Sequence, residues 1–296
     1  MIVVRLKGGL GNQMFQYALG RVLSIKNNTE LLFNIEAYED KTPRPFKNAM
    51  PVRDLQLDVF TIAGRVAQKS EIPWLYRMYG KGAFMLCIDA VRRRIFRHNA
   101  QELSFRPFTP RMLELGSNSY LDGFFQSPKY FEGYELIIRN DFTLKNIPGE
   151  AIRVLAEEIS KHNSVCVHLR RGDYVGNKAH EVVGMEYYKE GITYLGKNTA
   201  IEKIYVFSDD IEWCKNNLIF EFPTTFVGQE YVGHKDEGHM YLMSRCRHFI
   251  IANSSFSWWA AWLAECKEKI VVCPKQWFPD GSINTSDLLP EGWIRI

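Results

Sequence analysis

The sequence has no apolar run long enough to cross a bilayer and no large excess of either charge. Its most apolar stretch, residues 256–264, is well short of the roughly 20 residues that a membrane-spanning helix needs. The first apolar stretch is shorter than the core of a signal peptide. A net charge of +3 is too small for a general nucleic-acid surface. We therefore expect no membrane anchor and no nucleic-acid partner.

The cysteines show no spacing typical of a metal or redox site. They lie far apart without a C-x-x-C pair, and several occur inside apolar runs, at positions 87, 166, 214, 246, 266 and 273. Such cysteines are usually small buried side chains of proteins in a reducing compartment. We predict a cytoplasmic protein, and peripheral contact with the inner face of a membrane stays an open alternative.

The sequence does contain a regular alternation of strand-like and helix-like segments. The chain has 296 residues, enough for two domains of ordinary size. Residues 1–149 open with a strand, a glycine turn, a helix at 13–26 and a second strand, and we predict an α/β domain with a helical insert at 74–97. Residues 150–296 predict a Rossmann-like domain, in which helices cover both faces of a parallel sheet. Its strands are expected at 164–168, 203–207, 224–227, 248–252 and 269–273, and its helices at 150–161, 185–195, 211–217, near 238–246 and at 255–265.

Polar side chains follow three predicted strands of this second domain. The strands end at positions 168, 207 and 252, and the polar residues that follow them are Arg170, Arg171 and Asp173, then Asp209 and Asp210, then Asn253, Ser254 and Ser255. Ligands of open α/β sheets bind beyond the carboxyl ends of the strands. The sequence therefore predicts one ligand site built from all three segments.

The adjacent arginines favour a diphosphate ligand. A guanidinium stays charged and offers a fork of donors that matches two phosphate oxygens. The alternative is a surface salt bridge to Asp173, worth about 0–1 kcal/mol, and one arginine of the pair can serve structure. His168 is either a ligand contact or a hydrogen-bonded histidine at a strand end.

The segment Asn253, Ser254 and Ser255 precedes an apolar helix, so one serine should cap that helix while its N-terminus attracts an anion. The tryptophans of the helix are expected in the core. Asp209 and Asp210 either cap the next helix or accept hydrogen bonds from a ribose or a guanine. A D-x-D metal motif is absent at this place, so we expect arginines rather than Mg²⁺ to neutralise the phosphates.

The glycine-rich segment near the N-terminus is not a dinucleotide fingerprint. It follows a strand and precedes a helix, but G-x-G-x-x-G requires glycine where Met14 stands. Gly9 and Gly11 are instead expected to let a ligand or a facing domain approach the backbone. Asn12 and Gln13 become candidates for the lining of a cleft.

Four segments together resemble the α-1,2-fucosyltransferases, particularly bacterial members that decorate surface polysaccharide. They are GGLGNQMFQYALG at the N-terminus, VHLRRGDY in the centre, FSDDI with Trp213 and Cys214, and the late IIANSSFSWWAAWL. The resemblance implies a GT-B-like fold, in which two Rossmann-like domains face each other across a cleft. The N-terminal domain, residues 1–149, lies on the acceptor side, and the C-terminal domain binds the nucleotide. The resemblance also implies GDP-fucose as donor substrate, no metal or other cofactor, and transfer with inversion to the 2-hydroxyl of a galactose-terminated glycan such as O-antigen.

The resemblance also assigns roles to individual residues. Arg170 matches the arginine on the donor diphosphate, and His168 matches a nucleotide-contacting histidine. The family's phosphate- and nucleotide-contacting turn corresponds to Ser254, Ser255 and Phe256. Asp209 matches a residue near the nucleotide, and Asn12 matches an asparagine in the catalytic cleft. For the general base we select Asp173, with Glu181, Glu186 or no strong protein base as alternatives.

Other functions stay open at this stage. They are another glycosyl transfer, a glycan- or nucleotide-binding protein without catalysis, and a glycosidase, which the lack of a convincing carboxylate pair disfavours. The arginines at positions 92, 93, 94 and 97 are expected on a solvated helix face, with contact to anionic lipid as the alternative.

Overall fold

The computed structural model describes residues 1–39, 53–72, 99–101, 107–147, 149–172, 174, 176, 183–278 and 283–296. The expected helix at 74–97, its arginines, Asp173 and Glu181 lie outside these residues. The chain divides into two compact units, Met1–Thr143 and Leu144–Ile296, a few residues before the division at 149 that the sequence suggests.

The first unit contains a five-stranded sheet in which all pairs are parallel. Its order is β3-β2-β1-β5-β4, so β1 lies in the middle. The strands are β1 (Ile2–Arg5), β2 (Leu31–Asn34), β3 (Arg65–Val66), β4 (Asn99–Gln101) and β5 (Ser119–Asp122). The first two were predicted from alternation, whereas β3 and β4 are too short to give a periodic signal.

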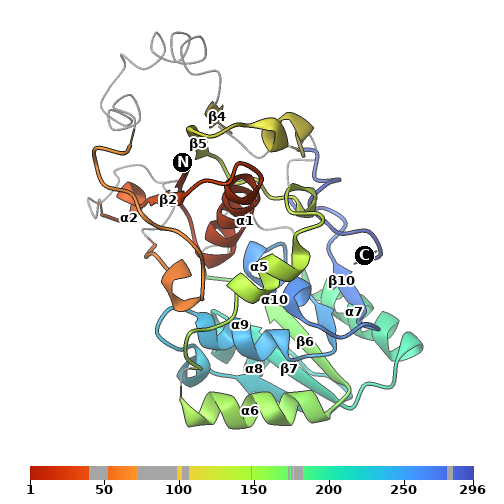
Figure 1. Ribbon diagram of the computed structural model, residues 1–296. Helices are drawn as coiled ribbons and strands as arrows, with labels where there is room; N and C mark the ends of the chain where they lie inside the picture. Colours follow the sequence, from red (N-terminus) through yellow and green to blue (C-terminus); the bar gives the residue numbers. More distant parts are fainter. Residues whose placement is uncertain are drawn as a thin grey trace. The chain divides into compact units, whose positions relative to one another are not determined.

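Helix α1 (Leu10–Lys26) packs against this sheet (Figure 1). It approaches β1 closely because Gly20 has no side chain, and a Cβ there would overlap Val4. The helix begins at Leu10 rather than at residue 13, so part of the expected glycine turn forms its first turn. Shorter elements complete the unit: α2 (Glu36–Glu39), η1 (Leu57–Val59), η2 (Pro110–Glu114), η3 (Pro128–Tyr130) and α5 (Glu135–Asp141).

The second unit contains a six-stranded sheet, again parallel throughout. Its order is β11-β10-β9-β6-β7-β8. The strands are β6 (Ser164–Leu169), β7 (Lys203–Ser208), β8 (Thr224–Val227), β9 (His248–Ile250), β10 (Val271–Cys273) and β11 (Ile294–Arg295). Five of these strands were predicted. The two-residue edge strand β11 was not.

Helices lie on both faces of this sheet (Figure 1), which confirms the Rossmann-like prediction. Helices α7 (Met185–Asn198) and α8 (Ile211–Asn217) pack on the face that carries Val165, Val167 and Leu169. Since side chains alternate along a strand, His168 points to the other face. That face is covered by α6 (Glu150–Lys161), α9 (Glu237–Ser244) and α10 (Ser255–Leu263).

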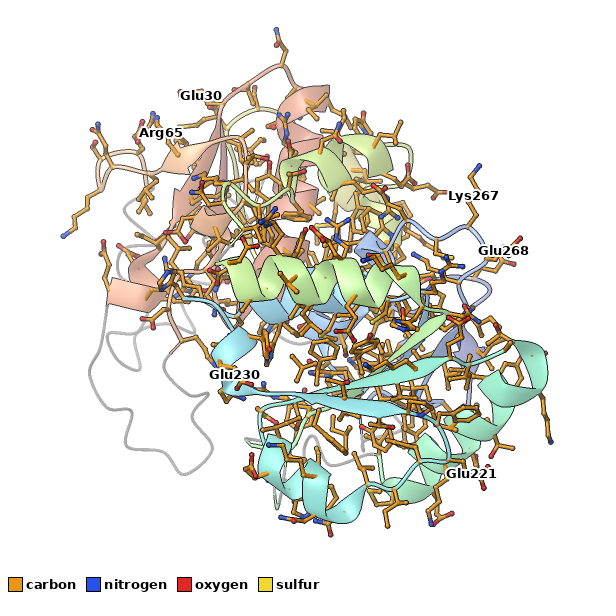
Figure 2. All side chains as sticks on the ribbon, turned by 90° about the horizontal axis from the view of Figure 1, so that it is seen from below. Glu30, Arg65, Glu221, Glu230, Lys267 and Glu268 are labelled. Atoms are coloured by element: carbon orange, nitrogen blue, oxygen red, sulfur yellow. The ribbon has the colours of Figure 1, made fainter. Side chains whose placement is uncertain are left out.

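Ion pairs occur at the outer edge of the first unit's sheet. Figure 2 shows Glu30 and Arg65 close together there, with Arg65 Nη2 3.4 Å from Glu30 and 2.7 Å from Glu71. Such charges discourage a further strand from pairing with an edge.

No helix in the described part of the chain has the length and apolarity to span a bilayer.

Candidate active site

The order of the second unit's strands defines where a ligand can bind. From β6 the chain moves outward through β7 to β8, then returns to β9 on the opposite side of β6 and continues to β10 and β11. In parallel sheets a ligand crevice forms beyond the carboxyl ends of two neighbouring strands from which the chain continues to opposite sides, here β6 and β9. Val167 of β6 pairs with Ile250 of β9. The arginine turn after β6 therefore lies beside the serines after β9.

Asp209, at the end of the neighbouring strand β7, fixes the shape of the arginine turn. Its carboxylate accepts hydrogen bonds from the backbone N–H groups of Arg171, at 2.8 Å, and Gly172, at 3.0 Å. The same carboxylate lies 3.2 Å from Arg170 Nε. A Cβ on Gly172 would lie 2.8 Å from the carboxylate, so the glycine makes this approach possible. None of these contacts was predicted from the sequence.

Arg171 is held by helix α8. Its guanidinium carbon lies 3.4 Å from the centroid of the Trp213 ring, and its Nε lies 3.2 Å from Asp210. Asp210 also accepts from Trp213 N at 3.3 Å, as the N-cap residue of α8. Arg171 therefore packs against α8 and pairs with Asp210, whereas the salt bridge considered with Asp173 lies outside the described residues. Arg170 is the better ligand candidate of the two.

Arg170 itself is oriented by two neighbours. Asp209 engages its Nε, and its guanidinium lies 5.8 Å from the centroid of the Tyr174 ring. The Tyr174 hydroxyl in turn donates to the Asn253 carbonyl oxygen at 3.1 Å. A hydrogen bond therefore connects the loop after β6 with the loop after β9, at the edge where the ligand is expected.

His168 is buried and uncharged. His168 is only 5% exposed, and its Nδ1 has no hydrogen-bond partner among the described residues. Burial lowers the pKa of His168 to about 3, although nearby Asp209 acts in the opposite direction. Its ring lies 6.0 Å from the ring of Phe256 on α10. A buried nitrogen without a partner suits a ligand contact better than a satisfied structural histidine.

The N-terminus of α10 forms the other side of this edge. Ser254 is the N-cap residue, and its hydroxyl accepts from Phe256 N at 3.4 Å. Asn253 donates through Nδ2 to the carbonyl oxygen of Trp277 at 3.0 Å and so holds the segment after β10. Trp258 and Trp259 are fully buried, which confirms their expected place in the core. Ser255 is the first residue of the helix, where an anion is favoured.

In the first unit, Gln13 is structural and the expectation that it lines a cleft is wrong. It is fully buried, and its side chain binds backbone groups in two loops. Its Nε2 donates to the carbonyl oxygens of Gly8 at 3.1 Å and Asp54 at 3.0 Å. Its Oε1 accepts from the N–H groups of Gln56 at 2.9 Å and Leu57 at 3.2 Å.

Asn12 differs from its neighbour, because it is half-buried and faces the loop after β5. Its Oδ1 accepts from Gln126 Nε2 at 2.6 Å. Gly9 is the N-cap residue of α1, and its surroundings are open, because a Cβ there would meet nothing within 4 Å. Gly11 is buried in the first turn of the helix. Sequence reasoning missed Gln126, although its position after a strand of a parallel sheet was a usable signal.

Of the alternative bases, only Glu186 is described. It lies exposed in the first turn of α7 and pairs with Lys189 at 2.8 Å, as a solvated helix residue does. Among the described His, Cys, Asp and Glu side chains, no group of three could hold a metal ion.

Two α/β units with parallel sheets, the second with a polar edge where its strand order reverses between β6 and β9, define a GT-B-type glycosyltransferase fold. The solved structure of a mutant Arabidopsis thaliana FUT1 in complex with GDP has this fold, with a TM-score of 0.51, 10% identity and coverage of 91% of this chain and 69% of that one. The profile of glycosyl transferase family 11 matches residues 101–296. The chain belongs to glycosyl transferase family 11.

Three relatives show the range of this similarity. The Alpha-1,2-colitosyltransferase of Escherichia coli is 34% identical, over 100% of this chain and 99% of that protein. The O-antigen biosynthesis glycosyltransferase WbnK of Escherichia coli is 30% identical, over 98% and 99%. The Galactoside alpha-(1,2)-fucosyltransferase 1 of Mus musculus is 25% identical, over 87% and 62%.

Proposed function

We propose that this glycosyltransferase moves L-fucose from GDP-fucose to the 2-hydroxyl of a terminal galactoside, with inversion, in the assembly of a bacterial surface glycan such as O-antigen. The proposal is supported by the four sequence segments shared with α-1,2-fucosyltransferases and by the names of the mouse relative and of WbnK. A cytoplasmic site of action and peripheral contact with the membrane belong to the same proposal.

One structural observation carries the donor half of the proposal. Arg170 and the N-terminus of α10 lie at the carboxyl ends of β6 and β9, the two neighbouring strands between which the strand order reverses. This edge offers a guanidinium fork and a helix N-terminus to the same ligand, and both favour phosphate oxygens. We therefore assign the diphosphate to Arg170, Ser254 and Ser255, and the nucleoside to His168 and Phe256.

In the proposed mechanism the acceptor hydroxyl attacks the anomeric carbon from the side opposite the leaving GDP. Positive charge develops on the sugar ring and negative charge on the departing diphosphate. Arg170, already oriented by Asp209 at 3.2 Å, stabilises that negative charge without having to reorganise. We propose that arginine replaces a metal ion in this role, and that Asp173 accepts the proton of the acceptor.

A second donor has a specific argument in its favour. The relative that is 34% identical is named a colitosyltransferase, and colitose is L-fucose without its 3-hydroxyl group. The two GDP-sugars share the diphosphate and the nucleoside that the site would bind. Discrimination between them therefore has to come from contacts to the sugar ring.

The proposal is tested by a thermal-shift panel containing GDP, GDP-fucose, GDP-colitose, GDP-mannose and UDP-galactose, with and without EDTA. A guanine ligand at 100 times its dissociation constant should add about 2.7 kcal/mol of stability, and EDTA should change nothing. GDP release with galactosides as acceptors then separates transfer from binding alone. The proposal is wrong if no guanine nucleotide stabilises the protein.

A further inference from the structure

We propose that Tyr174 is a positioning residue of the donor site, which holds Arg170 where it and the N-terminus of α10 can bind the same diphosphate. The inference rests on the proposed function, which assigns the diphosphate to Arg170, Ser254 and Ser255. Tyr174 acts through the arginine and is not placed in contact with the ligand.

The turn after β6 folds Tyr174 back toward Arg170. Tyr174 N donates to the carbonyl oxygen of Arg171 at 3.0 Å, which closes a tight turn over residues 171–174. The guanidinium carbon of Arg170 lies 5.8 Å from the centroid of the Tyr174 ring. At this distance a cation is attracted to an aromatic face. The ring therefore limits the positions that the guanidinium adopts.

The hydroxyl of Tyr174 connects this turn to the segment that leads into α10. It donates to the carbonyl oxygen of Asn253 at 3.1 Å, and Asn253 immediately precedes the N-cap residue of α10. The ladder between β6 and β9 ends at the pair of Val167 and Ile250. Beyond that pair, the bond made by Tyr174 sets the separation between Arg170 and the N–H groups at the start of α10.

The group that accepts this hydrogen bond is itself fixed. Asn253 is only 3% exposed, and its Nδ2 donates to the carbonyl oxygen of Trp277 at 3.0 Å. Trp277 is also buried, in the segment after β10. Ser254 N donates to the carbonyl oxygen of Ala252 at 2.8 Å, which shapes the same segment. Because its acceptor is fixed, a single hydrogen bond from Tyr174 is enough to position the arginine turn.

Asp209 holds the same turn from the other side. Its carboxylate accepts from the N–H groups of Arg171 and Gly172 and lies 3.2 Å from Arg170 Nε. The turn is thus attached to β7 through Asp209 and to the end of β9 through Tyr174, and these two strands flank β6. A donor that is already in place stabilises a developing negative charge without reorganisation. Tyr174 supplies half of that preorganisation.

Isothermal titration of GDP and GMP tests the inference. In Tyr174→Phe, which keeps the ring and loses the hydroxyl, the preference for GDP over GMP should fall about fivefold, the effect of one lost hydrogen bond. In Tyr174→Leu, which also loses the ring, the preference should fall about tenfold. GMP affinity should change by less than about twofold in both variants, because the nucleoside contacts are untouched. In the Arg170→Lys background, Tyr174→Phe should lower the preference no further.

Tyr187→Phe is the matched control. The buried Tyr187 hydroxyl also donates to backbone carbonyl oxygens in this sheet, those of Ile251 at 2.6 Å and Val272 at 3.1 Å. Its removal should lower the melting temperature and leave the preference for GDP over GMP unchanged. The control therefore separates positioning of the arginine from a general loss of stability.

Three results would count against the inference. An unchanged preference in both Tyr174 variants, with GDP still preferred by the wild type, would overturn it and leave the proposed function in place. An equal effect of Tyr174→Phe in the wild-type and Arg170→Lys backgrounds would also overturn it, because the tyrosine would then act independently of the arginine. A wild type that binds neither nucleotide would overturn the proposed function and the inference with it.

Discussion

The two units place polar residues at equivalent positions but equip them with different chemistry. In the second unit the edge after β6 and β9 carries Arg170, oriented by Asp209, and the N-terminus of α10. In the first unit the edge after β1 and β5 carries an amide pair, and its cations are bound to Asp122. The strand order thus determines where a ligand binds, and the side chains determine which ligand it is.

Arg170→Lys should cause the largest effect, because lysine keeps the charge but lacks the fork of donors. Loss of one preorganised donor to a developing negative charge typically lowers the rate by about 10²–10³. We expect this loss in GDP release with a galactoside acceptor, and an unchanged circular dichroism spectrum. Arg153→Lys, at an exposed pair with Glu150 on α6, is the matched control. Near-normal turnover in Arg170→Lys would assign the diphosphate to other residues.

Asp209→Asn should weaken GDP binding about tenfold, because one of the two oxygens that accept from the turn becomes an NH₂ group. The backbone N–H groups of Arg171 and Gly172 then lose a charged acceptor. Asp210→Asn is the matched control, since asparagine caps a helix about as well as aspartate. Isothermal titration with GDP compares the two. Equal affinities would show that the carboxylate of Asp209 does not shape the site.

Mild acid should affect the second unit more than the first. Burial lowers the pKa of His168 to about 3 and also lowers the pKa values of His239 and His248. The unfolded chain, in which histidine titrates near 6.5, therefore binds more protons below that pH, and stability falls as the pH falls from about 6.5 toward 3. The pKa of Asp122 in the first unit is also lowered, but the stability linked to it is lost only when the pH falls below the usual pKa of aspartate, about 3.9.

Hydrogen exchange at pH 7 and pH 5, corrected for intrinsic rates, measures this difference. Protection in β6, β7 and β9 should decrease, and protection in β1 and β2 should change less. His168→Gln should reduce the decrease. An equal loss of protection in both sheets would rule out the buried histidines as its cause.

Arg171→Lys should cause the smallest effect. The side chain packs on Trp213 and pairs with Asp210, so its loss should lower stability by about 0.5–1 kcal/mol. GDP affinity should change by less than about threefold, a difference below 1 kcal/mol. Urea denaturation and GDP titration measure the two quantities. A loss of GDP affinity as large as that of Arg170→Lys would return Arg171 to the ligand site.

Much of the second unit could be predicted because its elements are long and periodic. Helices α6 and α8 and strand β8 have the predicted bounds, and the polar residues after β6 and β9 are adjacent as expected. The short strands β3, β4 and β11 were missed, since two or three residues carry no periodicity.

The individual hydrogen-bond partners could not be predicted. Asp209 binds the arginine turn, and Gln13 binds four backbone groups, because the fold brings together residues far apart in sequence. The residue types were visible in the sequence, but their distances were not. The position of Gln126 after a strand was a usable signal, but its contact with Asn12 could not be predicted, because nothing near it in sequence indicates that contact.

The most direct test of the account compares the affinities of GDP and GMP for the wild type and for Arg170→Lys by isothermal titration. We predict that the wild type prefers GDP, because its second phosphate meets the guanidinium, and that this preference falls about tenfold in the variant. GMP, which shares the nucleoside contacts, should lose much less. An unchanged ratio of the two affinities would contradict the assignment of Arg170 to the diphosphate.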